Sequence, residues 1–301
     1  MTAFLGEPTE AKASGVCFSA AAILPSLLSF VLTVALLAVG LKIDETDYPD
    51  WYLYLSYILP QLSFLAIAVF YLKWTKRGIT PTLQKQARVK PVYFLVALVL
   101  QTGLLCLSSL NSWFLSLLGG LGYESSEILI PSVDGAGFFG VLLTVALLPA
   151  LMEEIFFRGV LLRGLRSFGD IGAALLCGAL FALFHQTPEQ TAYQFVCGAA
   201  FAWVAIRAGS VLPTVLSHFI NNALIIFEYK FEFMSAIQTP LLAVSLVCAA
   251  AFVVWAIFDR KEIRKKTDDK TEKRNFWLYA CVGVGICALV WLVAFFTGVF
   301  A

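Results

Sequence analysis

Charged residues are scarce in this sequence. Only 14% of its 301 residues are charged, against about 25% in a typical soluble domain. In their place, 60% of the residues are hydrophobic, and the mean hydropathy is +0.84. This balance excludes an ordinary soluble domain and indicates a polytopic membrane protein in contact with the lipid bilayer. The net charge of +1 gives no sign of a nucleic-acid partner.

Sequence signals of several other protein classes are also missing. The seven cysteines lie in apolar runs without a CxxC pair, so we interpret them as small apolar residues and not as disulfide or zinc ligands. The first residues carry two acids and one Lys, so no cleavable signal peptide is expected there. No fixed-period repeat or low-complexity linker divides the chain, which predicts a single integral-membrane domain over 1–301.

Nine apolar stretches approach or exceed the roughly 20 residues that a transmembrane helix needs. They lie at about 16–41, 51–72, 92–118, 137–166, 170–187, 190–207, 210–229, 238–258 and 276–300. The predicted fold is therefore all-α, a polytopic transmembrane helix bundle of about nine spans.

Basic residues are sorted between alternate connections of this bundle. Six Lys and Arg fall in 73–90 and eight fall in 259–275, whereas the connections between are richer in acids. If the N-terminus is cytoplasmic, 19 of the 21 Lys and Arg lie on the cytoplasmic side. We therefore predict a cytoplasmic N-terminus and an external C-terminus, in the plasma membrane.

Three of the stretches carry ionisable or amide side chains, which are costly in lipid and favour a functional site. These side chains are Glu153, Glu154, Arg158, His185, His218 and Asn222. The chain has only two histidines, and both are among them.

The spacing of the first three predicts a division of roles. Glu154 and Arg158 are four residues apart and share a helix face, so they are expected to form an ion pair. Glu153 points about 100° away from Glu154 and has no partner nearby in the sequence. The pair is thus expected to hold the helix while Glu153 remains available for chemistry.

The other polar residues are predicted to reach the same depth. His218 and Asn222 share a face, as do Phe181 and His185. Counted at about 1.5 Å per residue from the cytoplasmic edges at Arg166, Asp170 and Arg207, Glu153 lies roughly 20 Å deep, His185 roughly 22 Å and His218 roughly 16 Å. We expect these groups to line one water-accessible cavity.

A carboxylate and two imidazoles at one depth suggest the activation of a water molecule. Glu153 could act as general base, because a desolvated carboxylate is a stronger base, and His185 could share the water. His218 and Asn222 could donate hydrogen bonds to the oxyanion formed when the water attacks a peptide carbonyl. The predicted reaction is peptide hydrolysis within the membrane, on a membrane-associated protein or peptide.

A zinc site is the alternative for the same residues. Glu153, His185 and His218 with one water would make a familiar catalytic zinc shell, although the HExxH spacing is absent. Zinc would also consume the groups needed as base and oxyanion donors. The metal-free reading, with no cofactor, is therefore favoured over zinc.

Three motifs carry a family resemblance. The segments EEIFFR (153–158), FALFH (181–185) and HFINN (218–222) resemble the EExxxR, FxxxH and HxxxN motifs of the CPBP family of CAAX-processing and bacteriocin-processing intramembrane proteases. The resemblance covers about 137–229.

The resemblance implies a catalytic core of four consecutive helices. Glu153 and His185 would then bind the water, and His218 and Asn222 would bind the oxyanion, with Glu154, Arg158 and Phe181 in support. The family has been described both as metalloproteases and as glutamate-dependent proteases, and its substrates range from prenylated proteins to secreted peptides.

Two other function classes stay open on the sequence. A proton-coupled transporter also carries Glu and His within its spans, but would more often show inverted repeats. A non-catalytic scaffold or immunity protein would not need all of the motif residues intact.

Overall fold

The described part of the chain is entirely helical in its regular elements. The computed structural model describes residues 8–41, 48–83, 88–125, 129–259 and 261–300. The all-α prediction is confirmed.

The helices follow one another through short connections. They are α2 (Glu10–Ala38), α3 (Asp50–Thr75), α4 (Ile79–Leu83), α5 (Val92–Leu104), α6 (Leu107–Gly120), α7 (Gly137–Val141), η1 (Leu142–Leu147), α8 (Leu148–Glu154), η2 (Ile155–Leu161), α9 (Leu162–Gly164), η3 (Arg166–Phe168), α10 (Gly169–Phe184), η4 (Pro188–Gln190), α11 (Thr191–Ala208), α12 (Leu212–Phe231), α13 (Met234–Phe258) and α14 (Lys270–Val299). The elements α7 to α9 run on without a break as one rod, so the fourth predicted stretch is a single helical unit.

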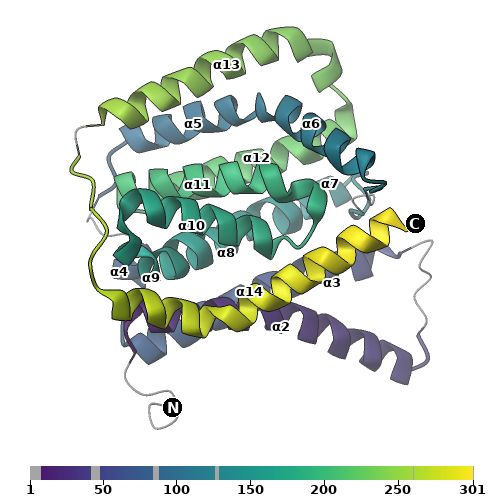
Figure 1. Cartoon of the computed structure of the whole chain (residues 1–301). Coiled ribbons are helices and arrows are strands. Elements are labelled where there is room, and N and C mark those ends of the chain that lie inside the picture. The colour runs from purple at the N-terminus through teal and green to yellow at the C-terminus, as the bar shows by residue number, and fades with distance from the viewer. Residues whose placement is uncertain (1–7, 42–47, 84–87, 126–128, 260, 301) are drawn as a thin grey trace.

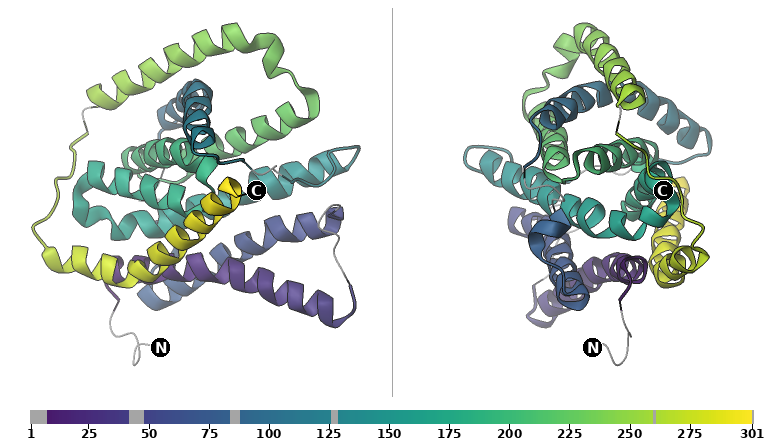
Figure 2. Two further views of the ribbon diagram at one scale, coloured as in Figure 1. Left: turned by 45° about the vertical axis from the view of Figure 1, so that its right-hand side comes forward. Right: turned by 90° about the vertical axis from the view of Figure 1, so that its left-hand side faces the viewer.

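The helices form three layers, and the motif-bearing core is the middle one. α2, α3 and α14 lie on one side, and α5, α6 and α13 lie on the other (Figure 1). Both turned views keep α8 to α12 between these outer layers (Figure 2). Within the molecule α10 packs on α11, α14 on α2 and α13 on α5. The flanking helices therefore cover the core on two sides.

The count of nine spans is not confirmed. Among the described residues, six helices are long and apolar enough to cross a membrane, and a seventh span is reached if α5 and α6, bent by 42°, count as one. α11 and α12 fail this test although both occupy predicted stretches. Their polar side chains lower their hydropathy, because these two helices carry part of the candidate site.

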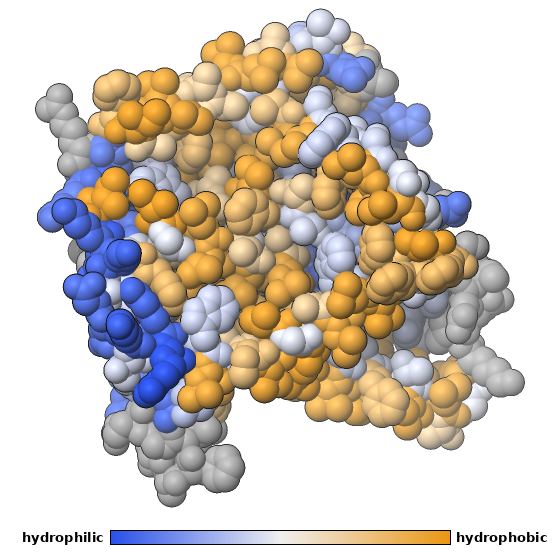
Figure 3. All heavy atoms as spheres, in the orientation of Figure 1, coloured by the Kyte–Doolittle hydropathy of each residue, from blue (hydrophilic) through white to orange (hydrophobic). Residues whose placement is uncertain are grey.

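The surface seen in Figure 3 is mainly hydrophobic, as expected for a chain in lipid.

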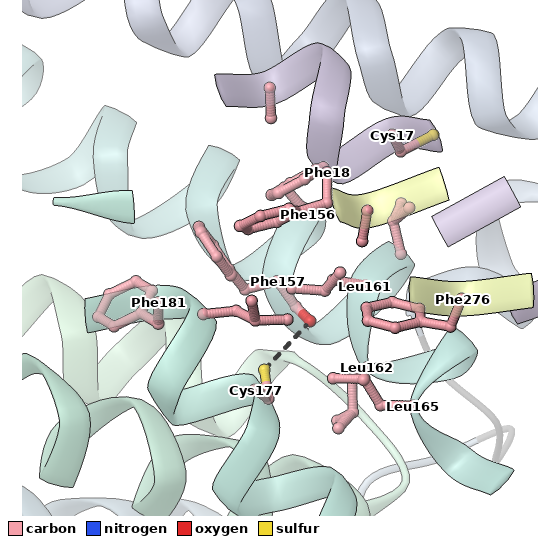
Figure 4. Packing of buried hydrophobic residues seen from close by; sticks show 14 of the residues in the cluster. Cys17, Phe18, Phe156, Phe157, Leu161, Leu162, Leu165, Cys177, Phe181 and Phe276 are labelled. Carbon is pink, nitrogen blue, oxygen red and sulfur yellow. Dashed lines mark hydrogen bonds between the residues drawn. The ribbon is translucent and has the colours of Figure 1, made fainter. Parts of the chain in front are cut away.

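The apolar core is centred on η2 and is rich in aromatic rings. Phe156 and Phe157 of η2 are fully buried, and the Phe157 ring meets the Phe181 ring edge-on, 4.9 Å between centroids. Cys177 lies in this core, its thiol directed at the Phe157 carbonyl (Figure 4). Rings packed in this way fix the helix that carries the two glutamates.

Both basic connections lie at the same end of the bundle. The backbone N–H of Val211 donates to the carbonyl of Leu83, and the N–H of Asp170 donates to the carbonyl of Arg264. Arg207 pairs with Asp259, 2.7 Å from Nε to Oδ2. The hydrophilic residues in Figure 3 gather where Figure 1 places the connection from α13 to α14. A shared end for the two Lys- and Arg-rich connections is what the sorting of basic residues between alternate connections predicts.

Some residues counted in the topology prediction are not part of this description. Lys42, Lys85 and Arg260 lie outside the described residues.

The hydrogen bond from Arg207 lowers the pKa of the Asp259 carboxyl. The stability that this pair contributes is therefore present above the pKa of Asp259 in the unfolded chain, and it is lost as the pH falls through the lower pKa of the folded state.

Candidate active site

The two glutamates sit where the fourth rod changes its winding. α8 ends at Glu154, and π-helical turns precede it in η1 and follow it in η2. Pro149, in the first turn of α8, lacks an N–H, which favours a break in the regular hydrogen bonding just before it. π-Turns inside α-helices occur frequently at functional sites. The rod continues past Arg158 to Gly164, as the depth argument requires.

Glu154 is the centre of a buried charge network. Its Oε1 lies 2.7 Å from Arg158 Nη1, and both side chains are completely buried. The predicted ion pair is therefore confirmed. The same Oε1 also accepts a hydrogen bond from His218 Nδ1 at 3.0 Å. This second link was missed, because a contact between residues 64 positions apart leaves no local signal in the sequence.

Arg158 ties three helices together. In addition to its contact with Glu154, Arg158 donates a hydrogen bond from Nη2 to the carbonyl of Gly198 on α11, at 3.1 Å. Its guanidinium carbon lies 4.6 Å from the centre of the Phe181 ring and 5.4 Å from that of Phe201. The face of an aromatic ring attracts a cation. The desolvated guanidinium is therefore held by a carboxylate, a carbonyl and two rings.

Two glycines allow α10 and α11 to approach this closely. A Cβ atom on Gly178 would lie 2.6 Å from the backbone nitrogen of Ala199, and one on Gly198 would lie 2.9 Å from Gly178 Cα. Small residues at crossing points permit such backbone contact in membrane bundles.

Phe201 is a site residue that the motif analysis did not find. A signal for it exists in the sequence, because 177–182 reads CGALFA and 197–202 reads CGAAFA. The two segments supply the crossing glycines and the two rings that flank Arg158. A short match between neighbouring helices therefore marks both sides of the guanidinium.

Glu153 differs from Glu154 in its surroundings. Its side chain is 14% exposed, whereas that of Glu154 is completely buried. Its Oε2 lies 4.0 Å from His218 Nε2, which is longer than a direct hydrogen bond. His218 thus faces both glutamates, one through each ring nitrogen.

His185 comes to the same place from the end of α10. Its Nδ1 donates to the carbonyl of Phe181 at 2.8 Å, and its ring packs on that of Phe181 with centroids 4.7 Å apart. The Phe181 ring also lies 6.1 Å from the His218 ring. The structure therefore brings both histidines against the same aromatic ring, that of Phe181.

Asn222 lies one helical turn beyond His218. Its Nδ2 is 3.5 Å from the carbonyl of Val145 in η1, and its Oδ1 lies 3.4 Å from Asn221 Nδ2. Glu153, Glu154, Arg158, Phe181, His185 and His218 are thus linked to one another, whereas Asn222 contacts Val145 and Asn221. That this group opens on a water-accessible cavity stays a prediction.

The zinc alternative requires the ligands to converge. Both histidines use Nδ1 toward an oxygen acceptor, an arrangement common to metal ligands and to acid–base histidines. Across the described residues, which include both histidines of the chain, no three His, Cys, Asp or Glu side chains are placed to hold a metal ion. Glu153, His185 and His218 are thus not gathered as metal ligands in this arrangement, and the choice between the metal-free and the zinc mechanism stays a prediction.

The core of the chain is similar to a known family. Residues 135–224 match the family model described as Rce1-like, type II CAAX prenyl endopeptidase Rce1-like. The resemblance to the CPBP family of CAAX proteases is confirmed. The match runs from just before α7 into α12 and so covers every motif residue, and similarity to a membrane protease family agrees with the apolar helices. Comparison with curated proteins and comparison with solved structures find no match.

Proposed function

We propose that this chain is an intramembrane endopeptidase that hydrolyses a peptide bond of a membrane-associated protein or peptide, with Glu153 as the general base. The observation that carries the proposal is the contrast between two adjacent carboxylates. Glu154 is fully engaged with Arg158 and His218, whereas Glu153 is partly accessible and stands 4.0 Å from His218 Nε2.

The chemical steps follow from this geometry. A water held by Glu153 and by the free Nε2 of His185 gives a proton to Glu153 as its oxygen attacks the peptide carbonyl. The carbonyl oxygen becomes an oxyanion, which accepts hydrogen bonds from His218 Nε2–H and from Asn222 Nδ2–H. Glu153 then passes its proton to the leaving nitrogen, and the C–N bond breaks to give a carboxylic acid and an amine, between which the remaining proton then passes.

The charge balance of the cluster supports a protonated His218. Its Nδ1–H already faces Glu154, so donation to the oxyanion requires a second proton on Nε2. With Glu153 and Glu154 ionised and Arg158 charged, one positive charge on His218 makes the group neutral overall. A neutral cluster is less costly to bury than one with a net charge.

Activity should not depend on a metal ion. Exhaustive chelation of the purified protein, followed by removal of the chelator, should leave cleavage of a membrane-tethered peptide unchanged, since the proposed chemistry uses only this chain's own groups. The check is turnover in liposomes before and after chelation, with peptides that do and do not carry a prenylated C-terminal Cys. Loss of activity that zinc restores would contradict the metal-free mechanism while leaving endopeptidase activity in place.

We also propose a cytoplasmic N-terminus, an external C-terminus and a plasma-membrane location. The sorting of Lys and Arg and the shared end of the two basic connections support this orientation. Reporter fusions placed at 73–90 and at 259–275 should both report the cytoplasm. An external signal from either fusion would contradict the orientation.

A further inference from the structure

A buried glutamine stands in the apolar helix α5, outside the three motifs. Gln101 is only 2% exposed, and its neighbours along α5 are mostly apolar. A buried primary amide is costly unless its hydrogen bonds are made. Gln101 Nε2 donates to Asn221 Oδ1 on α12 at 3.0 Å.

Asn221 receives a second hydrogen bond at the same oxygen. The hydroxyl of Tyr193, on α11, donates to Asn221 Oδ1 at 2.6 Å. Two donors from two different helices therefore fix which end of the Asn221 amide is oxygen. Its Nδ2 must then face the other way, where it lies 3.4 Å from Asn222 Oδ1.

The same logic carries to Asn222. Because a donor faces its Oδ1, the oxygen end of this amide is turned toward Asn221. Its Nδ2 end is left pointing toward η1, where it lies 3.5 Å from the carbonyl of Val145. Without the relay, Asn222 could present either end, and only the nitrogen end can donate to an oxyanion.

We infer that Gln101 and Tyr193 are positioning residues for the reaction, which act through Asn221 to hold Asn222 with its N–H groups directed into the site. This inference rests on the proposed function. It gives α5, which lies outside the family match, a defined part in the chemistry.

A double-mutant cycle tests the inference. The variants are Gln101→Met, Asn222→Ala and the two combined, assayed for kcat and KM on the same membrane-tethered peptide. Asn222→Ala should lower kcat by about 10²–10³-fold, the usual loss of one oxyanion donor. Gln101→Met should lower kcat by about 10-fold with KM unchanged, and should add nothing once Asn222 is absent. Thr102→Val, which removes a hydroxyl from the next position of α5 that bonds only to Leu98 O, is the matched control and should leave kcat unchanged.

Tyr193→Phe is the second probe, for the case in which Gln101→Met does not fold. It removes one hydroxyl and should lower kcat alone, again without effect in the Asn222→Ala background. A loss from Gln101→Met or Tyr193→Phe that is multiplied by Asn222→Ala, or that appears in KM only, would overturn the positioning role. Such a result leaves the proposed function intact as long as Glu153→Gln is inactive, whereas an active Glu153→Gln would remove the proposed function itself.

Discussion

Replacing Glu153 with Gln is expected to abolish peptide cleavage while leaving the bundle folded. The amide keeps the shape of the carboxylate but cannot take a proton from water, so the general base is lost. Folding should survive because Glu153 is not one of the groups that hold Arg158. The measurement is cleavage of a membrane-tethered peptide by the purified variant, with thermal unfolding in the same detergent.

Glu124→Gln is the matched control for this prediction. Glu124 is exposed and lies on the connection that follows α6, so the loss of its charge should change neither rate nor stability. Activity in Glu153→Gln within a few-fold of the unchanged protein would remove Glu153 from the mechanism.

Replacing Arg158 with Ala is expected to unfold or severely weaken the core. The change leaves the Glu154 carboxylate buried without its main counter-ion and removes the side-chain hydrogen bond to the Gly198 carbonyl. Breaking a buried ion pair in this way costs about 3–5 kcal/mol, which should appear as a large fall in the unfolding midpoint. Cleavage should fall as well, because Glu154 also holds His218.

A compensating variant separates the structural role of the pair from its chemical role. Glu154→Gln combined with Arg158→Met removes both charges and should recover most of the lost stability, since a buried pair can often be replaced by neutral groups of similar volume. It should not recover cleavage, because His218 then loses the carboxylate that its Nδ1–H faces. Equal stability in Arg158→Ala and the unchanged protein would show that the pair contributes little to folding.

The sequence predicted the helices well because lipid imposes a simple rule. Eight of the nine apolar stretches lie mainly on one helix or helical rod and 92–118 lies on the bent pair α5 and α6, since a chain in lipid must satisfy its backbone hydrogen bonds internally. The four-residue spacing of Glu154 and Arg158 likewise predicted a contact, because it is local to one helix.

The parts that sequence could not predict depend on how distant helices meet. The hydrogen bond from His218 to Glu154 and the one from Gln101 to Asn221 join residues on different helices. No residue spacing along the sequence predicts such contacts. The π-turns on either side of α8 were not predicted, because apolar periodicity does not distinguish them from an α-helix. The count of nine spans is not confirmed, because α11 and α12 are not apolar enough to count as candidate spans.

The central claim is that a water activated by Glu153 hydrolyses a peptide bond, and its most direct test uses isotopically labelled water. Purified protein in liposomes is incubated with membrane-tethered peptides in H₂¹⁸O, and the masses of the products are measured by mass spectrometry. The unchanged protein should yield a fragment whose new C-terminal carboxylate has gained one ¹⁸O, and Glu153→Gln should yield no such fragment. Labelled product at equal rates from both proteins would contradict the account.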